Sequence, residues 1–279
     1  MQNKVIITNP KEYEIKKQKL INGGAQKLHI VTDFDKTLSK AFDGDKKIHT
    51  VIAQIREGKY LSTEYTNAAY ALHAKYYPIE TNPNMSIEEK KPLMEEWWGT
   101  HIKTIAANGM NKKIVKDIAK KRIILREGTK EFFKEANKNK VPILILSAAL
   151  GDVIDEILKF NKIQSKNIHT ISNYFEFDKK GNVLGYKGKI IHCMNKNENE
   201  IENTKHYSKI KNRKNILLLG DSLDDLNMTE GIKYDNILKV GFLNDKIEDN
   251  LPAYKKAYDV IILNDGTMNF VKELIKEIK

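Results

Sequence analysis

Residues 28–38 read LHIVTDFDKTL, an apolar run that is followed at once by Asp33, Asp35 and a threonine. Short apolar runs of this kind are typical of buried parallel strands. Two carboxylates at the exit of such a strand repel each other unless a cation or a shared proton lies between them. The pattern therefore favours a metal or acid–base site over the alternative, in which one of the acids caps the next helix.

Three more apolar runs follow along the chain, at residues 143–146, 216–219 and 260–263. Between them, residues 129–139 and 151–160 carry apolar side chains at helical spacing. This alternation predicts an α/β fold with a parallel sheet. In such sheets ligands collect beyond the carboxyl ends of the strands.

The alternation is interrupted at residues 45–120, which are rich in Ala, Glu, Lys and Tyr and contain no convincing apolar strand. We interpret this stretch as a helical insertion that covers the strand ends. Residues 42–47, FDGDKK, form a turn-like entry, and the strand-like residues 123–125 would return the chain to the sheet. We therefore expect a core made of 1–44 and 121–279 and a helical cap at 45–120.

A second group of acids follows the run at 216–219, where Asp221, Asp224 and Asp225 come within a few residues of its end. The carboxyl ends of parallel strands meet at one edge of a sheet, so we expect these acids to approach Asp33. Oxygen ligands without a nearby His or Cys favour Mg²⁺. The alternative is that one or two of the acids cap the following helix.

Groups suited to binding phosphate occur elsewhere in the chain. Ser147 and Ala148 follow the run at 143–146 and precede a predicted helix, where a hydroxyl and free amides can bind phosphate oxygens. Lys196 could supply the positive charge that a transferring phosphoryl group requires. Composition alone does not single it out among 48 Lys and Arg residues.

The composition of the 279 residues limits the classes of protein that remain. Cys193 is the only cysteine, which excludes an internal disulfide and a cysteine-rich zinc site, and cytoplasm is the expected location. No apolar run approaches the roughly 18 residues needed to span a bilayer, so no membrane partner is expected. The net charge of +11 would suit nucleic acid, but the lysines are scattered. We expect a solvated surface, no nucleic-acid partner, and a monomer.

Together these motifs resemble the haloacid dehalogenase-like phosphohydrolases, and more narrowly the cytosolic 5′-nucleotidase III family of pyrimidine and 7-methylguanosine-phosphate nucleotidases. The resemblance is carried by DFDKTLS, YYPIE, EEWW, LREG, LSAALGDVIDEIL, ISNYFEFD, GYKGKIIH, LLLGDSLDDLNM and ILKVGFLNDK. It implies a Rossmann-like core with a helical cap inserted after the first catalytic strand. It also implies Mg²⁺-dependent hydrolysis of nucleoside 5′-monophosphates such as CMP, UMP or 7-methyl-GMP.

The resemblance also implies roles for the acids. Asp33 would attack phosphorus and become a phosphoaspartate, while Asp35 would protonate the departing nucleoside and then activate water. Asp33, the backbone carbonyl of Asp35, and Asp221 would hold Mg²⁺. Asp225 would support the water shell of the metal.

Further roles implied by the resemblance concern the substrate. Ser147, the Ala148 amide and Lys196 would grip the phosphate, and Glu80 in YYPIE would contact the base or sugar. Ala149 and Asp224 stand where the family usually has glycine.

Two adjacent tryptophans, Trp97 and Trp98, lie in the predicted cap. Neighbours on a helix point about 100° apart, so one can pack inward while the other faces the active-site mouth. We expect Trp97 to pack in the core. Trp98 could stack on a base, and a cationic 7-methylguanine would gain cation–π attraction there.

Three other functions compete with a nucleotidase. A phosphatase of the same superfamily for a sugar or cofactor phosphate would not need an aromatic partner in the cap. A receiver-type phosphorylated signalling module also gathers acids, a hydroxyl residue and a lysine at strand ends, but receivers are shorter and lack a long helical insertion. Nucleic-acid binding depends on the net charge alone.

Overall fold

The computed structural model describes residues 4–82, 84–196 and 206–279. Its main feature is an eight-stranded sheet in the order β1-β10-β9-β8-β2-β5-β6-β7, in which only the outermost strands, β1 and β7, run antiparallel to their neighbours. In that order the strands are Val5–Ile7, Val260–Leu263, Asn236–Leu243, Asn215–Gly220, Leu28–Thr32, Ile143–Leu150, Ile168–Phe177 and Val183–Lys187. The predicted α/β fold with a largely parallel sheet is confirmed.

Strand β2 lies in the middle of the sheet, and all five of its residues are buried. Its last residue, Thr32, pairs with Ile145 of β5 on one side and with Leu219 of β8 on the other. Strand β8 ends one residue beyond this level, at Gly220, while β5 continues to Leu150 with an irregular register after Leu146. The polar residues near this level of the three strands meet at a single edge, as the sequence predicted.

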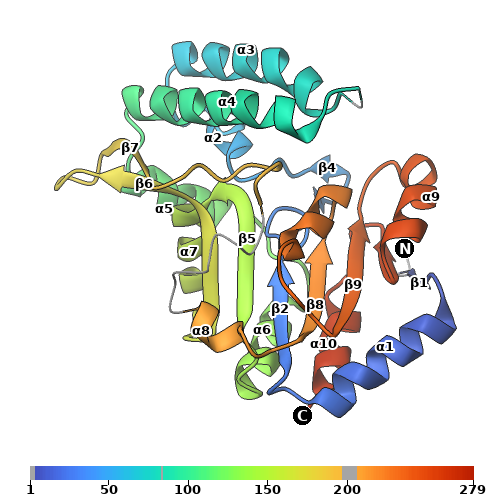
Figure 1. Cartoon of the computed structure of the whole chain (residues 1–279). Coiled ribbons are helices and arrows are strands. Elements are labelled where there is room, and N and C mark those ends of the chain that lie inside the picture. Colours follow the sequence, from blue (N-terminus) through green and yellow to red (C-terminus); the bar gives the residue numbers. More distant parts are fainter. Residues whose placement is uncertain (1–3, 83, 197–205) are drawn as a thin grey trace.

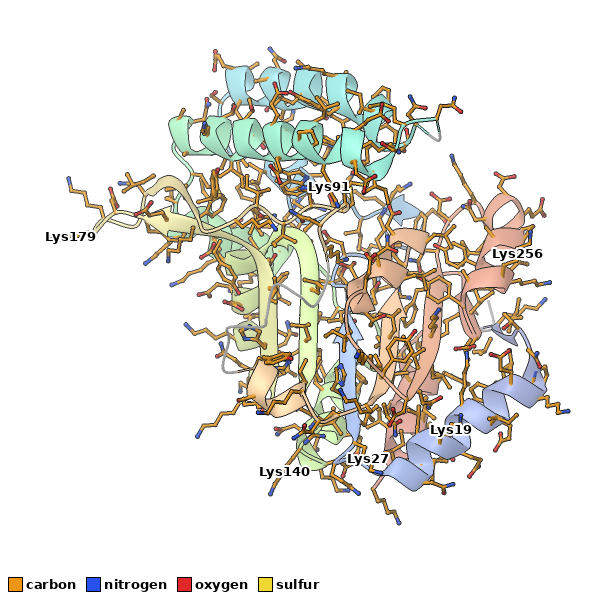
Figure 2. All side chains as sticks on the ribbon, viewed as in Figure 1. Lys19, Lys27, Lys91, Lys140, Lys179 and Lys256 are labelled. Atoms are coloured by element: carbon orange, nitrogen blue, oxygen red, sulfur yellow. The ribbon has the colours of Figure 1, made fainter. Side chains whose placement is uncertain are left out.

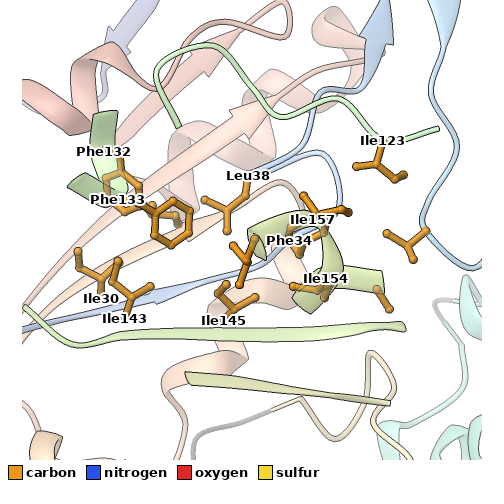
Figure 3. Packing of buried hydrophobic residues seen from close by; sticks show 14 of the residues in the cluster. Ile30, Phe34, Leu38, Ile123, Phe132, Phe133, Ile143, Ile145, Ile154 and Ile157 are labelled. Atoms are coloured by element: carbon orange, nitrogen blue, oxygen red, sulfur yellow. The ribbon is translucent and has the colours of Figure 1, made fainter. Parts of the chain in front are cut away.

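Alternate side chains of the central strands pack on opposite faces of the sheet, as the pleat requires. Ile30, Ile143 and Ile145 pack with α6 (Thr129–Lys138) and α7 (Gly151–Phe160), which supply pairs of Phe and Ile side chains (Figure 3). On the opposite face, Val31, Leu144 and Leu218 pack near α8 (Tyr207–Ile210). The two predicted helices thus form, within one residue of the expected bounds.

Further helices complete the layers around the sheet (Figure 1). They are α1 (Pro10–Gly23), α9 (Ile247–Ala257) and α10 (Asn269–Glu277), and α10 packs beside α6. A short 3-10 segment, η2 (Leu223–Thr229), follows β8 and carries Asp224 and Asp225, and Asp221 precedes it.

Two long helices lie above the carboxyl ends of the parallel strands and run antiparallel to each other (Figure 1). They are α3 (Thr63–Glu80) and α4 (Ile87–Ala107), and the short α2 (Ala53–Glu57) leads into them. Ser62 and Ser86 cap the two long helices, and Ser86 forms a capping box with Glu89. Helix α5 (Lys112–Lys121) instead packs against α7 of the core.

Some local predictions were wrong. Residues 123–125 do not form a strand, because Leu125 makes only an isolated bridge to Ser39 while Ile123 packs into the core. Strands β6 and β9 were not predicted, because β6 is only partly buried over most of its length and Lys239 interrupts the apolar run of β9. The turn-like segment at 42–47 does form a two-stranded hairpin, β3 (Phe42–Asp43) and β4 (Lys46–Lys47).

Lysines cover the surface without gathering on one face (Figure 2). The labelled examples lie on α1, on α4, on α9 and at the tip of the β6–β7 hairpin, with Lys27 preceding β2 and Lys140 following α6. Among the described residues, no helix has both the length and the apolar character needed to cross a bilayer.

Candidate active site

A cavity of 190 Å³ lies at the strand ends, between the sheet edge and the helices above it. Seven of the eight residues that the sequence singled out line it: Asp33, Asp35, Ser147, Ala148, Lys196, Asp221 and Asp225. They come from four separate stretches of the chain. The fold therefore brings the predicted groups to one place.

The centre of the cavity is an ion-pair network around Lys196. Its Nζ donates to Asp33 Oδ1 at 2.5 Å and to Asp225 Oδ1 at 2.8 Å. All three side chains are at least nine-tenths buried. Such a network neutralises two carboxylates that would otherwise repel each other across a small space.

Asp225 is held rigidly at the start of η2. Its Oδ2 accepts hydrogen bonds from the amides of Asp221, at 2.9 Å, and Ser222, at 3.0 Å. A Cβ on Gly220 would lie only 2.4 Å from the Cβ of Asp225, so the close approach requires glycine there. The predicted capping role thus belongs to Asp225, which also reaches Lys196.

Three carboxylates can converge on one cation. Oxygen atoms of Asp33, Asp221 and Asp225 lie within 4.8 Å of one another. This all-oxygen donor set suits Mg²⁺, which prefers carboxylates and water and keeps coordination positions for substrate oxygens. The residues present therefore fit the predicted metal.

The surroundings of these acids shift their pKa values upward. Burial, with help from the charge of Asp225, raises the pKa of Asp33 to about 6 although Lys196 opposes the shift. Burial and the charges of Asp225 and Asp33 raise the pKa of Asp221 well above its usual range. Burial disfavours the Lys196 ammonium, but the two carboxylates outweigh it and raise the lysine pKa. A divalent cation would relieve the repulsion among the acids.

Asp35 has different surroundings from Asp33. Both of its carboxylate oxygens accept a hydrogen bond from the amide of Val51, at 3.0 and 3.2 Å. Burial and the charge of Asp33 raise its pKa to about 7. A carboxyl with such a pKa is partly protonated at neutral pH, which a general acid requires.

A buried arginine, Arg126, holds the loop that carries Asp35. The sequence alone did not indicate this role. Arg126 donates to the carbonyls of Lys36 and, at 2.7 Å, Thr37, and it pairs with Asp265 at 3.2 Å. Its guanidinium also lies 4.3 Å from the centre of the Phe242 ring. Arg126 is the arginine of the family motif LREG, but nothing in the sequence indicates which loop it holds.

Asn173 is a second residue whose role sequence reasoning missed. Its amide nitrogen donates to the carbonyls of Ala148 and Ile191, both at 2.8 Å, and its oxygen accepts from the Ile191 amide. It thereby ties the second half of β5, which includes Ser147, to the loop that leads to Lys196. Asn173 lies in the family motif ISNYFEFD, but the sequence does not indicate which two segments its side chain connects.

Glu80, the eighth predicted residue, is not among the described residues that line the cavity. Its Oε1 accepts a hydrogen bond from the Cys193 thiol at 3.0 Å, and Cys193 does line the cavity. Burial raises the pKa of Glu80. The contact joins the end of α3 to the loop that carries Lys196.

The two tryptophans of α4 point in different directions, as expected, but it is Trp98 that packs against the hydrophobic core, while Trp97 is partly buried between α3 and α4. Trp97 stacks on Tyr76 of α3, with ring centres 5.7 Å apart and planes inclined by 12°. Trp98 lines the cavity. One ring therefore holds the helix pair together and the other faces the site.

Comparisons with known proteins agree with this geometry. Residues 36–279 match the family model described as pyrimidine 5′-nucleotidase (UMPH-1). The 7-methylguanosine phosphate-specific 5′-nucleotidase of Mus musculus is 37% identical over 264 residues, covering 93% of this chain and 87% of that protein. A Xenopus laevis protein of the same description, form B, is 35% identical over 274 residues, covering 98% and 94%.

Solved structures extend the comparison to the fold. A crystal structure of cytosolic 5′-nucleotidase IIIB bound to cytidine superposes with a TM-score of 0.86 at 28% identity, covering 100% of this chain and 94% of that one. A phospho-aspartyl intermediate analogue of phosphoserine phosphatase has a TM-score of 0.53 at 17% identity, covering 91% and 99%, which shows a shared fold. The chain therefore belongs to the pyrimidine 5′-nucleotidase (UMPH-1) family and is a phosphoric monoester hydrolase of the 5′-nucleotidase type.

Proposed function

We propose that this chain hydrolyses nucleoside 5′-monophosphates to nucleoside and phosphate, with Mg²⁺, through a phosphoaspartate on Asp33. The observation that carries the proposal is the convergence of Asp33, Lys196 and Asp221 at the end of the central strand, in a cavity that Trp98 also lines. The relatives named for nucleotides and the cytidine-bound neighbour support a nucleoside substrate.

In the first step a carboxylate oxygen of Asp33 forms a bond to phosphorus while the bond from phosphorus to the 5′-oxygen breaks. Asp35 donates its proton to that departing oxygen, and its raised pKa of about 7 supports this role. Lys196, within hydrogen-bond distance of Asp33, would hold the phosphoryl oxygens as charge develops.

In the second step Asp35, now ionised, accepts a proton from a water molecule whose oxygen attacks phosphorus. The bond between phosphorus and the Asp33 oxygen then breaks, which releases phosphate and restores the carboxylate. Ser147 and the Ala148 amide would orient the phosphate.

When bound, Mg²⁺ would supply charge stabilisation for the phosphoryl oxygens. We assign its side-chain ligands to Asp33 and Asp221, with the carbonyl of Asp35 as a third ligand. Asp225 would hold the metal's water shell and is itself fixed by two backbone amides.

We propose that residues 45–120 form a cap over the nucleoside end of the cavity. The contact of Glu80 with Cys193 and the position of Trp98 in the cavity lining support this, although α5 packs against the core. The choice between a pyrimidine and 7-methylguanine is left to experiment, since the family match carries one name and the curated relatives the other. We also propose that the protein is a monomer. The word cytosolic in the names of relatives supports a cytoplasmic location. The dispersed lysines support the absence of a nucleic-acid partner (Figure 2).

The test is phosphate release from CMP, UMP, AMP, 7-methyl-GMP and a panel of sugar phosphates, with Mg²⁺ and with EDTA. We expect a nucleotide to be the best substrate and EDTA to abolish turnover. Sugar phosphates that outrun every nucleotide would favour the alternative phosphatase, and a phosphorylated protein without turnover would favour the receiver module.

A further inference from the structure

Asp35, the proposed general acid, is oriented by one backbone group. Both oxygens of its carboxyl group accept a hydrogen bond from the Val51 amide, at 3.0 and 3.2 Å. Within residues 4–82, 84–196 and 206–279, no other group makes a hydrogen bond to that carboxyl. A general acid must lie within hydrogen-bond reach of the atom that it protonates. The direction of the Val51 N–H bond therefore governs where Asp35 points.

Val51 belongs to a segment that lies outside every helix and strand. Residues 48–52 connect β4 to α2 and pass along the cavity, which Thr50 and Ile52 line. The Val51 N–H shares one rigid peptide plane with the Thr50 carbonyl, so the two groups turn together. Segments without a regular hydrogen-bond ladder shift at a low cost in free energy. Other contacts must therefore hold this peptide plane in place.

A buried glutamine supplies those contacts from the first turn of α2. Gln54 is only 3% exposed, and its backbone amide donates to the Thr50 carbonyl at 3.1 Å. Its side-chain Nε2 donates to the carbonyl of His49, the preceding residue, at 2.9 Å. Gln54 thus holds both the peptide plane that carries the Val51 N–H and the plane before it.

Gln54 is itself anchored to the core by an arginine. Its Oε1 accepts a hydrogen bond from Arg122 Nε at 2.9 Å. Arg122 follows directly on α5, and its amide donates to the Ile118 carbonyl of that helix at 2.9 Å, while α5 packs against α7. An apolar side chain of similar size would fill the space of a buried glutamine without needing partners, so the two side-chain hydrogen bonds are what the amide group adds.

We propose that Gln54, anchored by Arg122, is a positioning residue that directs the Asp35 carboxyl toward the departing 5′-oxygen through the Val51 amide. Gln54 acts through other groups, because it is not among the described residues that line the 190 Å³ cavity. This inference rests on the proposed nucleotidase function and adds the residue that supports its acid. The 5′-oxygen of a nucleoside is a strong base that needs a proton as it departs, whereas p-nitrophenolate is a weak base that departs without one.

The test compares kcat/KM for the best nucleotide of the panel and for p-nitrophenyl phosphate in the wild-type protein and in Gln54→Met, which keeps the side-chain length and removes both side-chain hydrogen bonds. The value for the nucleotide should fall about 10- to 100-fold, and that for p-nitrophenyl phosphate less than about threefold. Tyr60→Phe is the matched control, because the Tyr60 hydroxyl donates to Asp117 of α5 at 2.8 Å and so ties the same two regions together without touching residues 48–52. It should keep the wild-type ratio between the two substrates.

A double variant gives a second readout that needs only the nucleotide. If Gln54 acts through Asp35, its substitution should matter little once the acid is gone, so Asp35→Asn with Gln54→Met should be within about twofold of Asp35→Asn alone. A merely structural role would give the same loss in both backgrounds. Equal losses would therefore overturn the proposal.

The outcomes separate this inference from the proposed function. If the wild-type protein hydrolyses no nucleotide, the proposed function fails and the role of Gln54 fails with it. If a nucleotide is hydrolysed but Gln54→Met lowers both substrates equally, or neither, only the role of Gln54 is overturned. Should circular dichroism show that Gln54→Met does not fold, Arg122→Met removes the anchor from a half-buried side chain and should lower the nucleotide value about three- to tenfold. An unchanged ratio between the two substrates in that variant would overturn the proposal as well.

Discussion

The sheet edge and the cap hold their functional residues in different ways. At the edge, Asp33 and Asp225 are buried and both are bonded to Lys196, and Asp33 directly follows β2, which pairs with β8 along its whole length. In the cap, Trp98 and Glu80 lie on two helices, and Glu80 meets the core through the Cys193 thiol. In the proposed function, the edge determines the reaction and the cap adjusts which nucleotide is accepted.

The largest effect should come from the edge. Asp33→Asn removes the attacking oxygen while keeping the size of the side chain, so kcat should fall by about 10⁴-fold or more. Phosphate release at saturating substrate measures this. Circular dichroism would check that the fold is kept, and a variant with more than a hundredth of wild-type turnover would contradict the role of Asp33.

Metal removal should be nearly as severe. EDTA should abolish turnover, and Mg²⁺ at about 100 times its Kd should stabilise the fold by about 2.7 kcal/mol, because it binds only the folded arrangement of Asp33 and Asp221. Activity and thermal unfolding with and without Mg²⁺ measure both effects. Restoration by Mg²⁺ but not by Na⁺ is the control, and full activity in EDTA would refute the metal site.

Lys196→Met should lower kcat by roughly 10²- to 10³-fold, because the phosphoryl group loses its cation. It should also destabilise the metal-free protein by about 3–5 kcal/mol, since two buried carboxylates lose their partner. Lys179→Met, at the tip of the β6–β7 hairpin, is the matched control. Equal kinetics in the two variants would show that Lys196 does not contact the phosphate.

The smallest effect should come from the cap, where adjacent tryptophans can be compared. Trp98→Ala should raise KM about tenfold or more through the loss of base stacking, with little change in kcat. Trp97→Ala should lower the melting temperature instead, because its ring packs on Tyr76. Substrate titrations and thermal melts of both variants separate the roles, and the reverse pattern would contradict the assignment.

The sequence predicted the edge better than the parts around it. The acids after β2 and β8 were found because a buried strand followed by carboxylates is a local pattern. Lys196 could be assigned only through the family resemblance, because nothing local distinguishes it from other lysines. The roles of Arg126 and Asn173 depend on contacts between segments distant in the chain, which no local pattern records.

The central claim is that Asp33 takes up the phosphoryl group. Rapid acid quenching of the Mg²⁺-loaded protein during turnover of CMP or 7-methyl-GMP, followed by peptide mass spectrometry, tests it directly. We predict a phosphorylated peptide with the modification on Asp33, and none in Asp33→Asn. Phosphate on another residue, or oxygen from labelled water that appears in the Asp33 carboxylate instead of the released phosphate, would contradict the account.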